Sequence, residues 1–234
     1  YNGLLTRVDH KNHTYRSINV WPEDNMGHGA EDAKYRFQWN FPLFFSPHNP
    51  KRLYTASNHL HVTENEGQHW ETISPDLTRN DSTKLKPSGG PITKDNTSVE
   101  YYCTLFAAAE SPRKKDLLWV GSDDGLIHVS EDGGKHWNNV TPVALPEWTM
   151  INSIEPDPHR DGGCYVAATA YKNHICSKLR ITEKHGHPLS LQSHPNTLQE
   201  CYGLIQCKLG YCMQEQNTVS LFQPMMEQIG NPSS

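Results

Sequence analysis

Two carboxylic acids, Glu100 and Asp124, are the side chains whose type and setting favour acid–base chemistry in this sequence. Hydrolysis of a glycosidic bond requires two carboxyl groups, one protonated as the acid and one ionised as nucleophile or base. The sequence therefore predicts this pair as catalytic candidates, with Asp95 or Asp123 as substitutes. The structural alternatives are that Asp123-Asp124-Gly125 only forms a hairpin turn and that Glu100 pairs with Lys94 or Arg36.

Further polar and aromatic residues are expected to gather around this pair. The connection between residues 74 and 100 is long and polar, and such loops are commonly either functional or flexible. Aromatic rings near the start of an inner strand can stack on sugars, although they equally fill a core. The residues expected to bind a ligand are Arg36, Trp39, Asn40, Asn58, Lys94, Asp95, Asn96, Tyr101, Asp123 and Trp148.

No metal or cofactor is expected in the part of the sequence that reads as strands. Four histidines, His48, His59, His61 and His128, lie on or beside strand-like runs, where filling or surface roles are the simpler interpretation.

The elements that must position these residues are short strands joined by a recurring octet. Residues 130–137 follow the pattern S-x-D-x-G-x-x-W, and residues 63–70 repeat it with Thr for Ser and Asn for Asp. The hydroxyl and carboxamide or carboxylate oxygens accept backbone N–H groups of a tight turn, glycine permits positive φ, and the indole covers the turn. The residues assigned to these turns are Thr63, Asn65, Gly67, Trp70, Ser130, Asp132, Gly134 and Trp137.

Self-similarity at this spacing predicts an all-β chain built of four-stranded antiparallel blades, as in a β-propeller. Strand patterns at 39–46, 53–57, 60–62 and 70–73 give one blade, and those at 101–109, 117–121, 126–129 and 137–140 give the next. A third blade opens at 150–154 and 165–168, while 3–7 and 14–20 form the outside of an earlier one. About three blades are therefore expected within residues 1–172.

The sequence changes character from about residue 173, where strand alternation fades and His, Gln and Cys accumulate. Methionine has one codon, so reading Met225 and Met226 from the third base forces Asp-Gly, and the same frame accommodates octets ending near His185 and Ile229. We therefore predict that residues 173–234 are an irregular tail translated out of frame. A divergent tail is one alternative, and a zinc site is another, formed by Cys201, Cys207 and Cys212 with His185 or His187.

Composition excludes some classes of partner. The net charge is −5 and no basic stripe is present, which argues against nucleic acid. No membrane-spanning run, signal peptide or initiator methionine is found in the 234 residues, and hydrophobic content is low at 35%. These features fit a fragment of a longer protein.

Four segments carry a resemblance to a known group of proteins. Residues 36–48, 74–80, 88–96 and 121–125 resemble the bacterial sortilin-like, Asp-box (BNR-repeat) proteins labelled glycosyl hydrolases, and the similarity extends over residues 1 to about 172. It implies a large exported propeller that is periplasmic, cell-surface or secreted. Because the enzymatic label of that group derives largely from the octet, the resemblance assigns no catalytic residues.

Two classes of function follow from these observations. The first is a carbohydrate-active or carbohydrate-binding propeller, and the second is a sortilin-like propeller that binds a protein or peptide without catalysis. An enzyme predicts convergent carboxyl groups in a groove with stacking aromatics. A receptor predicts exposed apolar surface and unpaired strand edges without such a pair.

Overall fold

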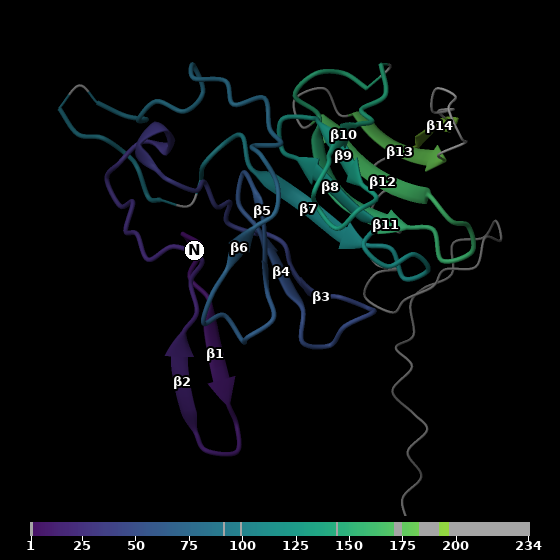
Figure 1. Ribbon diagram of the computed structural model, residues 1–234. Helices are drawn as coiled ribbons and strands as arrows, with labels where there is room; N and C mark the ends of the chain where they lie inside the picture. Colours follow the sequence, from purple (N-terminus) through teal and green to yellow (C-terminus); the bar gives the residue numbers. More distant parts are fainter. Residues whose placement is uncertain are drawn as a thin grey trace, which may run out of the picture.

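The chain folds as part of a β-propeller, all-β and built from antiparallel four-stranded sheets (Figure 1). The computed structural model describes residues 2–90, 92–98, 100–143, 145–170, 175–182 and 192–196. Three sheets, β3-β4-β5-β6, β7-β8-β9-β10 and β11-β12-β13-β14, follow one another along the chain, each an up-and-down meander. A two-stranded sheet, β1-β2, precedes them. The prediction of an all-β fold with about three four-stranded blades is confirmed.

The strands are short, as the spacing of the turn residues requires. The elements are β1 (Thr6–Asp9), β2 (Thr14–Ser17), the 3₁₀-helix η1 (Ala30–Asp32), β3 (Leu43–Phe45), β4 (Leu53–Ala56), β5 (Leu60–Thr63), β6 (Glu71–Thr72), β7 (Leu105–Glu110), β8 (Leu118–Ser122), β9 (Ile127–Ser130), β10 (Asn138–Asn139), β11 (Met150–Pro156), β12 (Gly163–Ala170), β13 (Ile175–Thr182) and β14 (Gln192–Asn196).

The sheets pack face to face, and the alternation of side chains along β8 shows how. Leu118 and Val120 point into the core shared with the β3–β6 sheet, whereas Trp119 points into the core shared with the β11–β14 sheet. Gly121 follows where no side chain fits, since a Cβ built there would lie 2.3 Å from Ile151 Cγ2. A strand that is apolar on both faces therefore occupies the middle sheet of the three, as in a stack of blades.

The two octets fold into turns with the same hydrogen bonds. Thr63 Oγ1 accepts the N–H of Gly67 at 3.0 Å, and Ser130 Oγ accepts the N–H of Gly134 at 2.8 Å. Both glycines have positive φ, +73° and +97°. Beyond the turn, Asn65 Oδ1 accepts the N–H of His69, as the Asp132 carboxylate accepts that of His136, both at 2.9 Å.

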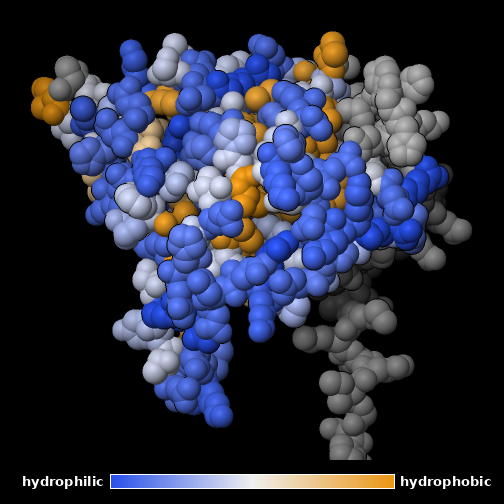
Figure 2. Space-filling model, in the orientation of Figure 1, coloured by the Kyte–Doolittle hydropathy of each residue, from blue (hydrophilic) through white to orange (hydrophobic). Residues whose placement is uncertain are grey.

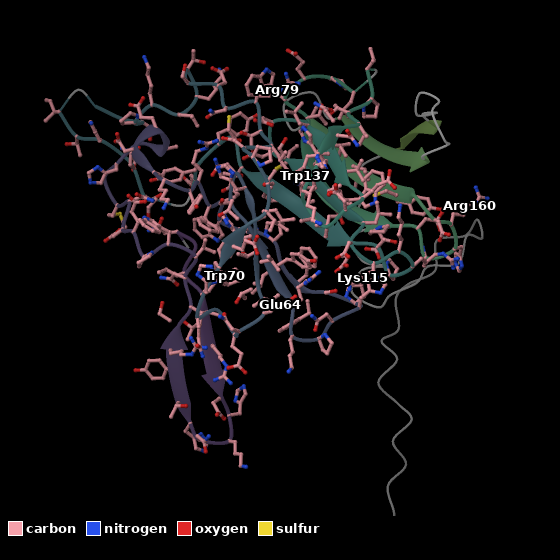
Figure 3. All side chains as sticks on the ribbon, viewed as in Figure 1. Glu64, Trp70, Arg79, Lys115, Trp137 and Arg160 are labelled. Carbon is pink, nitrogen blue, oxygen red and sulfur yellow. The ribbon has the colours of Figure 1, made fainter. Side chains whose placement is uncertain are left out.

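Each octet ends in a tryptophan that reaches the preceding sheet. The indole of Trp70 donates to the Ile18 carbonyl at 2.8 Å, and that of Trp137 donates to the Ile73 carbonyl at 3.0 Å. Ile18 and Ile73 are equivalent positions, because their N–H groups bond to the carbonyls of Leu5 and Leu60 in the same way. Neighbouring sheets are therefore joined by a repeated bond from indole to main chain. Figure 3 labels the two tryptophans that donate these bonds.

Two strands lie in the segment that was expected to be an irregular tail. β13 and β14 complete the third sheet by antiparallel pairing with β12 and with each other. The remaining residues of that segment, including the cysteines and histidines of the zinc alternative, lie outside the described residues. The out-of-frame origin of 173–234 therefore stays a prediction.

No helix long and apolar enough to cross a bilayer occurs in the part of the chain that the structure describes.

Candidate functional site

The loops that join strands alternate between two ends of the sheets, and one end is rich in buried polar side chains. The β4–β5 and β8–β9 turns lie at this end with the 73–104 connection, and Figure 3 places Arg79 there, away from Glu64 and Lys115. Most of the residues expected to bind a ligand lie at this end. Their contacts decide which of them remain available for one.

Arg36 and Asn58 are buried in a hydrogen-bonded network centred on Asp76. The Arg36 guanidinium donates to Asp76 Oδ2 at 2.6 Å and to the Cys103 carbonyl at 3.1 Å. Asn58 accepts the Arg36 backbone N–H at 3.0 Å and donates to Asp76 Oδ2 at 2.9 Å. Burial alone would raise the pKa of Asp76, but hydrogen bonds from Thr78 and Asn58 and the charge of Arg36 lower it overall. The network fastens the 73–104 connection to the strand ends.

Asp123 and Asp124 are buried and hydrogen-bonded by the fold. Asp123 accepts the backbone N–H of Thr104 at 2.9 Å and its hydroxyl at 2.8 Å. Asp124 accepts the Ser122 hydroxyl and, at 2.8 Å, the backbone N–H of Arg79. Desolvation raises the pKa of Asp123 to about 7, against the hydrogen bonds from Thr104 and with a further contribution from the Asp124 charge. These contacts are those expected if Asp123-Asp124-Gly125 forms a hairpin turn between β8 and β9.

Trp148 is packed against other side chains of the same end. Its ring stacks on Tyr102 with centroids 5.5 Å apart, and the Arg79 guanidinium lies 5.5 Å from its centroid. Arg79 also pairs with Glu147 at 3.1 Å. Trp148 has φ of +61°, an unfavoured conformation for a bulky residue that the surrounding contacts hold in place.

The glycine-rich part of the long connection forms a small hairpin of its own. Asp95 donates its N–H to the Ser88 carbonyl at 2.9 Å, and Asn96 Oδ1 accepts the Ser88 N–H at 3.0 Å. The Asn96 carbonyl accepts the Gly27 N–H at 3.0 Å, which ties this hairpin to the loop that follows β2. Lys94 and Asp95 are exposed.

An open groove of about 730 Å³ is lined by two of the candidates and by residues that follow this hairpin. Its volume is typical of small-ligand sites. Trp39, 48% exposed, lines it together with Glu100, which is also exposed. The described lining residues are Asn2, Leu4, Asn19, Pro22, Glu23, Asp24, Met26, Trp39, Thr97, Ser98 and Glu100.

Hydrogen bonds between distant segments hold the walls of this groove together. Asn2 donates to the Glu23 carbonyl at 2.8 Å, and Asn25 donates to Asn2 Oδ1 at 3.2 Å. Asn19 accepts the Leu5 N–H at 2.7 Å. The Tyr101 hydroxyl donates to the Asn25 carbonyl at 3.3 Å, which places Tyr101 behind the wall. The groove is thus formed by the fold before any ligand arrives.

The two predicted catalytic carboxyl groups, Glu100 and Asp124, lie in different surroundings. Glu100 lines the groove, whereas Asp124 is buried in the β8–β9 turn and is not among the described lining residues. Of the residues expected to bind a ligand, Trp39 lines the groove, and Asn40 is exposed next to it in the chain. The ligand-binding role of Trp39 and Asn40 remains a prediction. The described hydrogen bonds of Arg36, Asn58, Tyr101 and Asp123 join segments of the fold.

Sequence reasoning did not single out the lining that comes from the N-terminal segments. Glu23, Asp24 and Met26 belong to a stretch interpreted only as a loop, and Asn2, Leu4 and Asn19 lie in the segments before β1 and after β2. No local pattern marks them, because the groove forms where these segments meet Thr97, Ser98 and Glu100.

Among the described residues, no group of three or more His, Cys, Asp or Glu side chains has the arrangement of a metal site.

Comparison with known proteins gives partial matches. No family model matches the chain. A stretch of 60 residues is 40% identical to the oligoxyloglucan-reducing end-specific xyloglucanase of Emericella nidulans, covering 25% of this chain and 7% of that protein.

Two solved structures give similarly partial alignments. The GH74 xyloglucanase from Xanthomonas campestris aligns at a TM-score of 0.34 and 15% identity, over 81% of this chain and 36% of that one. The GH74 enzyme from Niastella koreensis aligns at 0.29 and 11%, over 80% and 37%. The chain therefore spans little more than a third of either structure, and its fold assignment rests on its own strand pairing.

Proposed function

We propose that this chain is part of a glycan-binding β-propeller, and that the glycan lies in the groove beside Trp39. The observation that carries the proposal is a half-exposed indole and an exposed carboxylate, Glu100, in one preformed groove. A sugar ring presents an apolar C–H face to an aromatic ring, while its hydroxyl groups donate to carboxylate oxygens. The partial identity to a xyloglucanase supports a carbohydrate ligand over other small molecules.

The character of the surface also supports a glycan over a docked protein. A protein-binding face needs a contiguous apolar patch, usually of several hundred Å². On the face drawn in Figure 2 the surface is largely hydrophilic, with hydrophobic residues in small patches. The alternative, a sortilin-like propeller that binds a peptide or protein, is distinguished by the test below.

Hydrolysis is a separate proposal within this function. A glycosidase needs its second carboxyl close to the first, across the scissile bond. Glu23 and Asp24 line the same groove as Glu100, whereas Asp124 is enclosed by its own hydrogen bonds. If the groove is catalytic, we expect Glu100 to act with Glu23 or Asp24 and the protein to be exported with its substrate outside the cytoplasm.

Calorimetric titration with xyloglucan oligosaccharides and with a panel of other neutral oligosaccharides tests binding, and release of reducing ends tests hydrolysis. We expect saturable binding of at least one oligosaccharide that Trp39→Ala weakens. The proposal is overturned if no oligosaccharide binds, or if a peptide library yields tighter ligands that compete for the same groove.

A further inference from the structure

The groove is largely apolar, and three acidic side chains interrupt its lining. Glu23, Asp24 and Glu100 line it, and none of the described lining residues is Lys or Arg. Asp24 accepts the Met26 N–H at 3.0 Å, and Glu23 accepts the Lys34 N–H at 3.3 Å, so each contact engages one oxygen of its carboxylate. A concave site lined by one sign of charge attracts ligands of the opposite sign.

Glu100 is the most available of the three carboxylates. It is exposed, and within the described part of the chain no residue forms a hydrogen bond or ion pair with it. Its charge is therefore not neutralised by the fold, in contrast to that of Asp76, which pairs with Arg36.

Lys34, whose backbone bonds to the acidic lining, holds its charged group against an aromatic ring. Lys34 bonds to Glu23 only through its backbone N–H, while its ammonium group lies 3.4 Å from the centroid of the Trp21 ring. Trp21 does not line the groove. The described contact of the ammonium group is therefore with an aromatic ring, while Glu23 receives only the backbone N–H.

The negative charge of the lining also affects Tyr101, which packs behind the lining residues. Burial, together with the charges of Glu23, Asp32 and Asp24, raises the pKa of the Tyr101 hydroxyl to about 12. Tyr101 bonds to the loop carbonyls of Asn25 and His28, directly behind the lining residues. Two of the three lining carboxylates therefore act on the same region of space.

We propose that the groove selects glycans that carry ammonium groups, namely oligosaccharides of de-N-acetylated amino sugars, over neutral and anionic ones. The inference rests on the glycan-binding function proposed above and adds the charge class of the ligand. The sugar ring stacks on Trp39, and its ammonium groups pair with the groove carboxylates. Uronic acids and sulfated sugars are repelled by the same carboxylates.

The test compares ligands that differ in charge but share a backbone. Binding of a glucosamine hexamer to the full chain is measured by calorimetry beside its fully N-acetylated counterpart, a xyloglucan oligosaccharide and an oligogalacturonate. We expect the glucosamine hexamer to bind about tenfold tighter than the N-acetylated one, because several half-exposed ion pairs contribute. The preference should shrink in high salt, because salt screens exposed charges.

Charge-neutralising variants locate the effect. Glu100→Gln should weaken binding of the glucosamine hexamer about threefold, and that of the N-acetylated hexamer by less, because only the first loses an ion pair. Glu71→Gln, which removes an equal charge from an exposed position on β6 outside the groove, is the matched control. Circular dichroism confirms that both variants fold.

The outcomes separate the inference from the function on which it rests. If neutral hexamers bind as tightly as the glucosamine hexamer, or if Glu100→Gln acts no differently from Glu71→Gln, the charge selection is wrong while glycan binding stands. If no oligosaccharide of any charge binds, the glycan-binding function itself fails. If a lysine-rich peptide competes more tightly than the hexamer, the groove belongs to a basic peptide and both proposals are overturned.

Discussion

Two sets of carboxylates in this molecule have opposite surroundings. Asp123 and Asp124 are buried at the strand ends, with oxygens that accept backbone N–H and hydroxyl groups of neighbouring segments. Glu100 lies exposed in the groove, and Glu23 and Asp24 each have only one oxygen in a described hydrogen bond. The comparison teaches that an acidic pair in sequence is weak grounds for catalysis, because a carboxylate that the fold saturates stabilises structure and has little capacity left for a ligand.

The sharpest test of this comparison removes a saturated carboxylate. Asp124→Ala leaves the Arg79 N–H and the Ser122 hydroxyl without their acceptor in a buried turn, and we expect the free energy of unfolding to fall by about 2–4 kcal/mol. Urea denaturation followed by tryptophan fluorescence measures the change. A loss below about 0.5 kcal/mol would show that Asp124 is not a structural residue.

A substitution in the groove should lower glycan affinity without lowering the free energy of unfolding. Trp39→Ala removes the stacking surface, and we expect glycan affinity to fall about three- to tenfold because an aromatic stacking partner is lost. Trp21→Ala is the matched control, since Trp21 is similarly exposed at 44% and does not line the groove. Equal losses of affinity in both variants would remove Trp39 from the site.

The pH dependence of stability distinguishes the buried pair from the groove. Because the pKa of Asp123 is raised to about 7 in the folded state, that state holds the proton more tightly, and the Asp123 contribution to stability falls as pH rises from about 4 to about 7. Asp123→Asn should remove a slope on the order of 1 kcal/mol per pH unit over this range. The opposite sign applies to Asp76, whose lowered pKa gives a contribution present above about 3.8 and lost in more acidic solution.

Urea titrations of wild type and Asp123→Asn at matched pH values check this expectation. The expectation is contradicted if the free energies of unfolding of the two proteins change equally between pH 4 and pH 7.

The smallest effect is expected at the exposed member of the comparison. Glu100→Ala should change the free energy of unfolding by less than about 0.5 kcal/mol, because the side chain is exposed and has no described partner to lose. The same denaturation assay measures it. A loss comparable to that of Asp124→Ala would erase the distinction between the two sets.

The fold could be predicted from the sequence because its determinants are local. Strand alternation and the residues of each octet lie within short windows, and the turn at 130–137 needs only Ser130, Asp132 and Gly134 to form its hydrogen bonds. Every repeat of such a window adds an independent observation of the same unit, which is how the four-stranded sheets could be anticipated.

The candidate site could be predicted only in part, because it is built from distant segments. Trp39 and Glu100 were identified as strand-adjacent residues, but nothing near Asp24 in sequence indicates that it faces residues 97–100. Asp124 was assigned to the same site as Glu100 from its position in a turn, whereas its hydrogen bonds to Ser122 and Arg79 depend on the path of the 73–104 connection. Loop paths of this length follow from tertiary contacts that no short pattern encodes.

The bonds from Trp70 and Trp137 have an evolutionary consequence. Their acceptors are main-chain carbonyls at Ile18 and Ile73, and a carbonyl is present whatever amino acid occupies the position. Val140 repeats the backbone bond of Ile73, and so presents an equivalent acceptor. A duplicated unit would therefore bring its own indole and meet a ready-made counterpart on its neighbour, so that gene duplication can lengthen such an array without matched substitutions in the older copy.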